Sequence, residues 1–331
     1  MRLSLVTLGP TRVVGRLAPS PTGRLHLGHA RSFMLSWWSA RAAGGRIVLR
    51  VEDLDVSRVE QTWIDVTRRD LEWLGLDWDE EHLQSDALPR INAEVSRLLN
   101  AGAAYACTCS RGDIKRAQSA PHAEDHTEIY PGTCRGRYAG VAEAERRSGK
   151  AAGVRFQARA GITEFHDQLA GLQRQDVAEA VGDFLIAKRD GAPAYQIAVV
   201  VDDHAQGVTE VVRGDDLLSS TPRQLLLQQA LGYDAPRYVH VPLVVDSAGR
   251  RLAKRHDSLS LAALQQRGIP AGRVAAWVAN SAGLFSMRGG SPKHQPPSQL
   301  SPRELIPEFS WEKLQRAPVV VSEQTLQELG A

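Results

Sequence analysis

The residues that could do chemistry first gather near the start of the chain, in "APSPTGRLHLGHARSF" at positions 18–33. His26 and His29 lie three positions apart, so they share one face of a helical first turn. Both rings can donate hydrogen bonds to phosphate, which the start of a helix after a tight loop also attracts. Gly28 would let a purine or ribose approach the backbone. The pattern favours a nucleotide site, although a helix cap with two surface histidines is the alternative.

The three cysteines of the chain form a second group of reactive side chains, Cys107, Cys109 and Cys134. In a reducing compartment such a cluster indicates a metal rather than disulfides. Three thiolates suit zinc, which takes four ligands in a closed structural site. Chemistry alone favours His122 or His126 as the fourth ligand. Three reduced cysteines without a metal are the alternative.

Strands and helices that could position these residues alternate along the N-terminal part of the chain. Residues 12–18 and 46–53 have the apolar and β-branched content of strands, whereas 28–43 and 59–76 are expected to be helices. The alternation favours an α/β fold with a parallel sheet and crossover helices.

The same alternation resumes after residue 184. We expect strands at 208–214 and 238–245 and, between them, a helix at 221–232 that opens with a threonine cap and a proline. Beyond Ser258 the sequence predicts mainly helix with proline-rich breaks.

Changes in character along the chain predict four regions. They are the first half of a catalytic domain, an insertion with a metal site and little apolar core, the second half of the catalytic domain, and a short, mainly helical C-terminal region. We place them at residues 1–104, 105–183, 184–257 and 258–331.

Composition limits the class of protein. The chain has 331 residues, 43% of them hydrophobic and 24% charged, with a net charge of +2. These values are ordinary for a soluble globular protein and exclude a strongly basic nucleic-acid coat, while a local basic face remains compatible. The first apolar run is too short for a secretory core, and no stretch approaches the ~20 apolar residues of a membrane helix. We therefore expect a cytoplasmic protein without a membrane partner.

Three separated segments carry a resemblance to a known family. "HLGH" after "APSPTG" resembles the HIGH motif of class I aminoacyl-tRNA synthetases. Together with "LRVEDLD" and "VVRGDDLLSSTPRQLLL", the stretch "RLAPSPTGRLHLGHAR" resembles glutamyl-tRNA synthetases, over residues 12 to about 260. The resemblance implies a class I synthetase-type Rossmann fold that activates L-glutamate with ATP and Mg²⁺ to glutamyl-adenylate. Because both ATP elements and a glutamate pocket remain although the anticodon module is absent, we expect this activation to proceed without tRNA.

The short segment after the second catalytic half narrows the resemblance further. A full bacterial glutamyl-tRNA synthetase adds a large helical anticodon-binding region, for which this chain has too little sequence. The shortened layout resembles the glutamyl-Q tRNA(Asp) synthetase paralogues, which attach glutamate to queuosine in the anticodon of tRNA(Asp). A compact glutamyl-tRNA synthetase that charges the tRNA 3′ end and a non-catalytic tRNA-binding paralogue are the alternatives.

For ATP, the resemblance implies binding by His26, Gly28, His29 and Lys254, with both histidines and the lysine catalytic. Lys254 lies in "RRLAKR" at 250–255, which resembles a degenerate KMSKS loop. An arginine replaces the first lysine of that motif, and alanine and arginine replace the serines. The remaining lysine would neutralise charge on the departing pyrophosphate.

For glutamate, the resemblance implies binding by Arg16, Ser20, Glu52, Tyr195 and Arg213. Glu52 and Arg213 each end a predicted strand, where ligands of open α/β sheets bind. Glu52 suits the α-ammonium group, and Arg213 suits bidentate pairing with a carboxylate. A structural ion pair between Glu52 and Arg213 is the alternative.

For the metal, the resemblance points to a tyrosine as the fourth ligand, in the pattern Tyr-x-x-x-Cys. The predicted set for one structural Zn²⁺ per chain is Cys107, Cys109, Tyr130 and Cys134. His166 and His240 are assigned no role, because histidines of this kind are more often structural.

Overall fold

The computed structural model describes most of the chain: residues 12–55, 59–117, 129–252, 257–284 and 299–322, and also 325, 327 and 329. Lys254, His122 and His126 lie outside the described residues. Within the part described, no helix is both long and apolar enough to cross a membrane.

The N-terminal half contains the predicted parallel sheet. Strands β1 (Val14–Leu17), β2 (Arg46–Val51) and β3 (Glu80–Leu83) pair in parallel in that order. Helix α1 (Leu27–Ala42) connects the first two strands, and α2 (Gln61–Trp73) lies between the second and third. Strand, helix, strand and helix therefore follow one another as the sequence predicts, and the parallel sheet is confirmed.

The second half supplies another parallel pair beside β1. Strand β9 (Glu210–Gly214) pairs in parallel with β10 (Arg237–Val241), and α8 (Thr221–Leu231) connects them. The backbone N–H of Thr209 donates to the carbonyl of Val14 at 2.9 Å, which joins the start of β9 to β1. The carboxyl ends of β1, β2 and β9 consequently face the same side, where open α/β sheets bind ligands.

Two local predictions in this half are wrong. The strand expected at 238–245 is divided into β10 and β11 (Val244–Val245), with Pro242 in the break. Proline has no N–H with which to continue a ladder. Helix α8 has Ser220 rather than Thr221 at its N-cap position. The Thr221 hydroxyl instead accepts a hydrogen bond from Arg213 at 2.8 Å.

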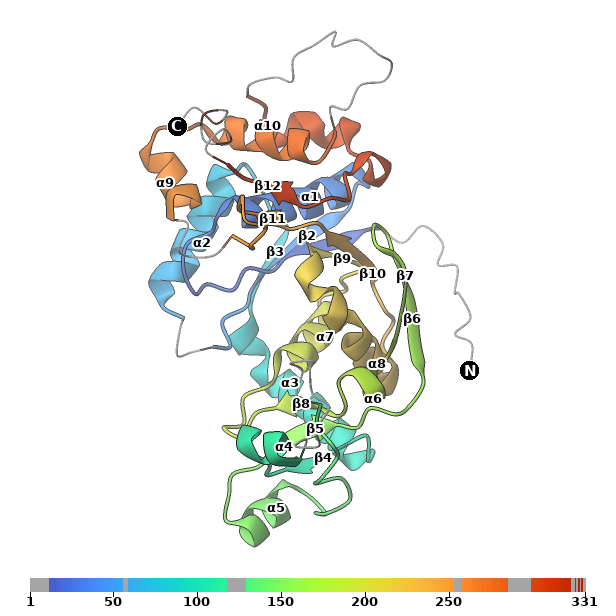
Figure 1. Cartoon of the computed structure of the whole chain (residues 1–331). Helices are drawn as coiled ribbons and strands as arrows, with labels where there is room; N and C mark the ends of the chain where they lie inside the picture. Colours follow the sequence, from blue (N-terminus) through green and yellow to red (C-terminus); the bar gives the residue numbers. More distant parts are fainter. Residues whose placement is uncertain are drawn as a thin grey trace.

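The insertion forms its own antiparallel sheet at the lower end of the molecule in Figure 1. Strand β5 pairs with β4 on one side and with β8 on the other. We expected β8 to belong to the second catalytic half, but its pairing places it with the insertion. The elements at this end are β4 (Ala104–Cys107), α4 (Arg111–Ala117), α5 (Val141–Ser148), β5 (Gly153–Phe156) and β8 (Phe184–Ala187). The antiparallel pair β6 (Ile162–Asp167) and β7 (Gly171–Asp176), followed by α6 (Val177–Ala180), lies higher in the figure, where β6 contacts β10 and α8.

The apolar core of the insertion is shared with two long helices of the body. Phe156 and Phe184 pack with Ile91 of α3 (Leu88–Asn100) and Ile197 of α7 (Tyr195–Ala205) in one buried cluster. The insertion is thereby connected to α7, whose first residue lies in the predicted glutamate site.

The C-terminal region packs on α1, as Figure 1 shows for α10. The Trp38 indole N–H donates to the carbonyl of Pro302 at 2.8 Å, and the Trp311 indole N–H donates to Ser39 Oγ at 3.0 Å. Most elements are helical, as predicted, but a short strand also pairs with β11. The region contains α9 (Leu261–Gln266), α10 (Ala271–Ser281), the 3₁₀ helices η4 (Pro302–Glu308) and η5 (Trp311–Lys313), and β12 (Val319–Val320). Earlier 3₁₀ turns lie at η1 (Gln84–Ala87), η2 (Asp215–Ser220) and η3 (Asp257–Leu259).

Helix α1 is buried on nearly all sides because the sheet covers one face and the C-terminal region another. Leu27, Met34, Leu35, Trp37 and Trp38 are all fully buried. A helix enclosed in this way is apolar around its circumference rather than along one stripe. The first turn of α1, which carries both histidines, is therefore part of a rigid element.

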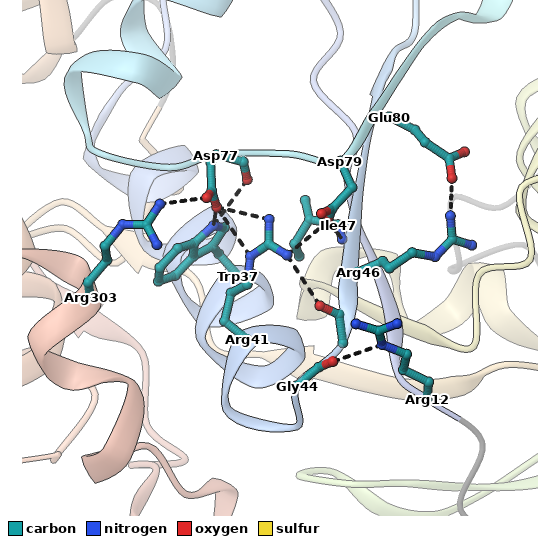
Figure 2. Close-up of polar contacts among 11 residues, drawn as sticks. Arg12, Trp37, Arg41, Gly44, Arg46, Ile47, Asp77, Asp79, Glu80 and Arg303 are labelled. Carbon is teal, nitrogen blue, oxygen red and sulfur yellow. Dashed lines mark hydrogen bonds and ion pairs between the residues drawn. The ribbon is translucent and has the colours of Figure 1, made fainter.

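A polar cluster fixes the far end of α1 (Figure 2). Arg41 donates to Asp77 Oδ1 at 2.9 Å and to Asp79 Oδ2 at 2.8 Å, in the segment before β3. Asp77 also accepts hydrogen bonds from the Trp37 indole at 2.8 Å and from Arg303 of η4 at 2.6 Å. One carboxylate thus joins α1, the sheet and the C-terminal region.

Candidate active site

A cavity of about 630 Å³ opens at the carboxyl ends of β1, β2 and β9. The described residues that the sequence predicts for ATP or glutamate all line it: Arg16, Ser20, His26, Gly28, His29, Glu52, Tyr195 and Arg213. A second concavity, of about 720 Å³ beside Tyr130 and Asp183, is lined by none of these eight. The fold thus brings together residues that span most of the chain.

Backbone contacts set the tautomers of both histidines. The Gly28 N–H donates to Nδ1 of His26 at 3.1 Å, and the His26 N–H donates to Nδ1 of His29 at 3.2 Å. Because each Nδ1 accepts a hydrogen bond, it carries no proton of its own, so each ring is neutral with its proton on Nε2. Burial, and then the neighbouring His26, hold the pKa of His29 well below its usual value. The pair can therefore offer two N–H dipoles from adjacent rings, whose centroids are 3.8 Å apart.

The structure gives Gly28 a packing role different from the predicted one. A Cβ at this position would lie 3.0 Å from Cε1 of the His26 ring. The space that we expected a purine or ribose to use is thus occupied first by His26, which caps α1. The absence of a side chain at Gly28 permits that capping contact.

The described part of the KMSKS-like segment also reaches the cavity. Arg251 lines it and forms an ion pair with Asp216. Lys254, the residue predicted to act there, lies outside the described residues. The position of Arg251 shows that this segment borders the same space as His26 and His29.

Charges of both signs lie at the other end of the cavity. Glu52 accepts from Arg50 at 3.4 Å, and the Arg16 Nη1 donates to the carbonyl of Val212 at 2.7 Å. The Nε of Arg16 is buried and has no hydrogen-bond partner among the described residues. Burial raises the pKa of Glu52, although Arg50 and Arg16 counteract it. A cation brought to Glu52 would therefore stabilise its ionised form.

The partner of Glu52 is not the one considered in the sequence. Glu52 and Arg213, both within the described part of the chain, form no ion pair with each other. The partner of Glu52 is instead Arg50, two positions earlier in β2. Arg50 is fully buried and also donates to Asp203 at 2.7 Å and to Gln206 at 2.9 Å. This support could not be predicted from the sequence, because Asp203 lies 153 positions away from Arg50.

A second buried network, also missed, surrounds Arg213. Its Nε donates to Nε2 of His240 at 3.0 Å, and its Nη2 donates to Thr221 Oγ1 and to Gln224 Oε1, both at 2.8 Å. His240 contacts Asp167 at 2.6 Å, across 73 positions of sequence. No local pattern could identify the pair, because β6 meets β10 only in the folded chain.

The three cysteines meet at the base of the insertion. Sγ atoms of Cys107, Cys109 and Cys134 all lie within 4.8 Å of one another, so the cluster could hold a metal ion. Tyr130 Oη lies 3.4 Å from Cys107 Sγ and 3.6 Å from Cys109 Sγ. A tetrahedral site with metal–sulfur bonds of about 2.3 Å separates its donors by roughly this distance.

The surroundings of Tyr130 suit a coordinating oxygen. The Cys134 N–H donates to Tyr130 Oη at 2.8 Å, and the Arg155 guanidinium lies 3.8 Å from the centre of the Tyr130 ring. Both contacts would stabilise negative charge on the phenol oxygen. The donor set that the resemblance implies is therefore assembled in space and fits a thiolate-rich metal site.

Comparisons with known proteins agree with this geometry. The family described as tRNA synthetases class I (E and Q), catalytic domain, matches residues 12–327. The glutamyl-Q tRNA(Asp) synthetase of Nitratidesulfovibrio vulgaris is 44% identical over 280 residues, which cover 82% of this chain and 86% of that protein. The glutamyl-Q tRNA(Asp) synthetase of Rhodopirellula baltica is 40% identical over 322 residues, covering 94% of this chain and 97% of that protein.

A solved structure shows the same fold. It is a glutamate tRNA ligase from Elizabethkingia meningosepticum, with a TM-score of 0.77 and 24% sequence identity, and the match covers 96% of this chain and 69% of that one. The parallel sheet, the histidine-bearing first turn and the relatives all lead to one assignment. The chain belongs to the class I tRNA synthetases and, within them, to the glutamyl-Q tRNA(Asp) synthetase family of ligases.

Proposed function

We propose that this protein activates L-glutamate with ATP, without tRNA, and transfers the glutamyl group to queuosine in the anticodon of tRNA(Asp). One observation carries the activation step. The neutral imidazoles of His26 and His29 line the same cavity as Glu52, Arg16 and Arg213. A phosphate site and an amino-acid site therefore border one space.

The reaction needs no covalent nucleophile from the protein. A glutamate carboxylate oxygen attacks the α-phosphorus of ATP, forms a new P–O bond and displaces pyrophosphate. N–H groups of His26 and His29 donate to the phosphate oxygens on which charge develops, and Lys254 neutralises the leaving pyrophosphate. Mg²⁺ accompanies ATP. The rest of the catalysis is positioning.

The charged end of the cavity recognises the amino acid. Glu52 pairs with the α-ammonium group, and Arg213 and Arg16 pair with carboxylate. Ser20 and the half-exposed Tyr195 supply hydroxyls. Because Glu52 is buried beside Arg50, the incoming ammonium group meets a carboxylate that is already held in place.

The cysteine cluster binds one structural Zn²⁺ through Cys107, Cys109, Tyr130 and Cys134. Zinc would join β4, which carries Cys107, to the segment that ends the long polar stretch of the insertion. Such a site stabilises a region with little apolar core of its own. The buried cluster around it is small and, beyond the four proposed ligands, contains Tyr105, Ile114 and Tyr138 among the described residues.

The names of the relatives support the proposed acceptor of the glutamyl group, queuosine in tRNA(Asp). Both relatives described above are named glutamyl-Q tRNA(Asp) synthetases, and the match covers 97% of the second. A flexible anticodon loop can extend a single base into a cavity, which suits recognition of a modified nucleoside. A queuosine hydroxyl then attacks the activated carbonyl and displaces AMP.

Two measurements test the two steps separately. ATP–pyrophosphate exchange should require glutamate and proceed without tRNA. Labelled glutamate should then be transferred to tRNA(Asp) that contains queuosine, and the label should survive removal of the 3′-terminal adenosine. If the exchange appears only after tRNA is added, the tRNA-independent step is refuted. If the label requires an intact 3′ end and forms on tRNA(Glu), the chain charges tRNA ends instead.

A further inference from the structure

Three buried side chains hold Arg213 in one orientation. Its Nε and Nη2 are occupied by His240, Thr221 and Gln224, and its Nη1 has no hydrogen-bond partner among the described residues. Arg213 nevertheless lines the cavity. The guanidinium is thus held along one edge by the protein, while the rest of it remains for a ligand.

The proton positions in this network follow from the donors. A guanidinium only donates, so Nε2 of His240 must accept the bond from Arg213 Nε. A neutral imidazole then carries its proton on Nδ1, which donates to Asp167 Oδ2 at 2.6 Å. The Thr221 hydroxyl accepts from Arg213 and lies 3.2 Å from the same Nε2, to which it can donate. Only this tautomer lets Nε2 of His240 accept from Arg213 while Nδ1 donates to Asp167.

Asp167 is itself fixed by the backbone. Its Oδ1 accepts from the N–H groups of Leu169 at 3.0 Å and Ala170 at 2.8 Å, and its Oδ2 accepts from the His240 N–H at 3.1 Å. Asp167 and His240 are both fully or almost fully buried. The carboxylate therefore selects the tautomer of an imidazole that cannot turn.

We infer that Asp167 and His240 are positioning residues that orient Arg213 for the glutamate carboxylate, with Asp167 keeping His240 in the tautomer that accepts from Arg213. This inference rests on the proposed role of Arg213. It links Asp167 of β6, through His240 of β10, to Arg213 of β9. It also gives a function to His240, for which the sequence predicted none.

The groups around His240 favour its neutral form. Burial lowers the pKa of His240 and Arg213 lowers it further, although Asp167 opposes them. The charged and titratable groups that face His240 are Tyr238 of its own strand and, from neighbouring elements, Asp167 of β6, Arg213 of β9, Asp215 of η2 and Arg16 of β1. A protonated His240 would place a donor against Arg213, so neutrality and the orientation of Arg213 go together.

The Asp167→Asn variant tests the tautomer directly. The N–H groups of Leu169 and Ala170 keep the amide oxygen on their side, so the amide NH₂ faces Nδ1 of His240. The imidazole proton then moves to Nε2 and opposes the Arg213 Nε–H. We expect the KM for glutamate to rise on the order of tenfold or more, because a buried donor loses its acceptor. The KM for ATP should change little.

A second substitution provides a matched comparison. In His240→Gln the amide oxygen can accept from Arg213 while the amide NH₂ donates to Asp167, so its KM for glutamate should stay within about threefold of wild type. His240→Met has no acceptor of this kind and should resemble Asp167→Asn. The comparison of Gln with Met at position 240 remains decisive if Asp167→Asn fails to fold.

Two controls separate the inference from the proposal beneath it. His166→Gln changes an exposed histidine next to Asp167 and should leave both KM values unchanged. Arg213→Ala should raise the KM for glutamate; if it does not, the proposed role of Arg213 fails. If Arg213→Ala raises it but Asp167→Asn and His240→Met do not, the inference alone is overturned. Equal increases in the KM for ATP and for glutamate would show a purely structural role and would also overturn it.

Discussion

Replacement of Arg50 by methionine should destabilise the protein strongly. Arg50 is fully buried, and the side chains of its partners Asp203 and Glu52 are only 8% and 9% exposed. Methionine fills most of the volume but leaves two buried carboxylates beside an apolar side chain. Removing one member of a buried ion pair costs about 3–5 kcal/mol. Because the carboxylates of both Asp203 and Glu52 lose a partner, the loss in free energy of unfolding for Arg50→Met should lie at the upper end of that range.

Urea unfolding followed by tryptophan fluorescence measures this loss, because Trp37 and Trp38 are fully buried in the same core. A matched control lies on the same strand. Arg46 pairs with Glu80, but those side chains are 37% and 40% exposed, so Arg46→Met should cost less than about 1 kcal/mol. If the free energies of unfolding of Arg50→Met and Arg46→Met differ by less than about 1 kcal/mol, the buried ion pairs of Arg50 with Asp203 and Glu52 do not stabilise the fold.

The pH dependence of the same variant gives a second check. Burial already raises the pKa of Glu52, and Arg50 is the main group that opposes this. Without Arg50 the folded-state pKa of Glu52 should rise further above the unfolded value of about 4.3. A carboxyl with a raised pKa destabilises the fold as pH rises through that pKa. The loss in free energy of unfolding caused by Arg50→Met should therefore be smaller at about pH 5 than at about pH 8. A loss that does not change with pH would contradict the role of Arg50 in keeping Glu52 ionised.

Three further outcomes follow from other parts of the structure. His29→Ala should slow ATP–pyrophosphate exchange on the order of 10²-fold with little change in the KM for glutamate, and a wild-type rate would remove His29 from the mechanism. Wild-type protein purified without chelator should contain about one zinc per chain by elemental analysis, and Cys107→Ser much less; zinc-free wild type would leave only reduced thiols. Although burial raises the pKa of Asp77, hydrogen bonds from Trp37 and Arg303 and the charge of Arg41 lower it overall. Asp77→Asn should therefore be less stable than wild type above the unfolded pKa of about 4, with the difference shrinking as pH falls below it, as urea titrations at two pH values will show.

Features determined by neighbours in the sequence were predictable. The strand, loop and helix around His26 and His29 follow from turn residues and spacing within a few positions. The alternation of strands and helices predicted the parallel sheet, because crossover connections leave few other arrangements. Cys107, Cys109 and Cys134 lie in one part of the sequence, so their thiols predicted a cluster that could hold a metal, and the structure brings them together. The break at Pro242 was also visible in principle, since proline interrupts a ladder.

Contacts between distant segments were decided only by the tertiary structure. Asp167 and His240 are 73 positions apart, and Arg50 and Asp203 are 153 apart. Spacing shows which face of a strand a side chain occupies, but not which strand or helix will cover that face. Arg50 and His240 are buried only after strands and helices distant in the sequence pack over them. In an exposed strand, the same guanidinium or imidazole would remain hydrated. The sequence by itself therefore identified eight described residues that line one cavity, and the packing of β6, β10 and α7 decided which buried side chains hold Arg50 and Arg213 in place.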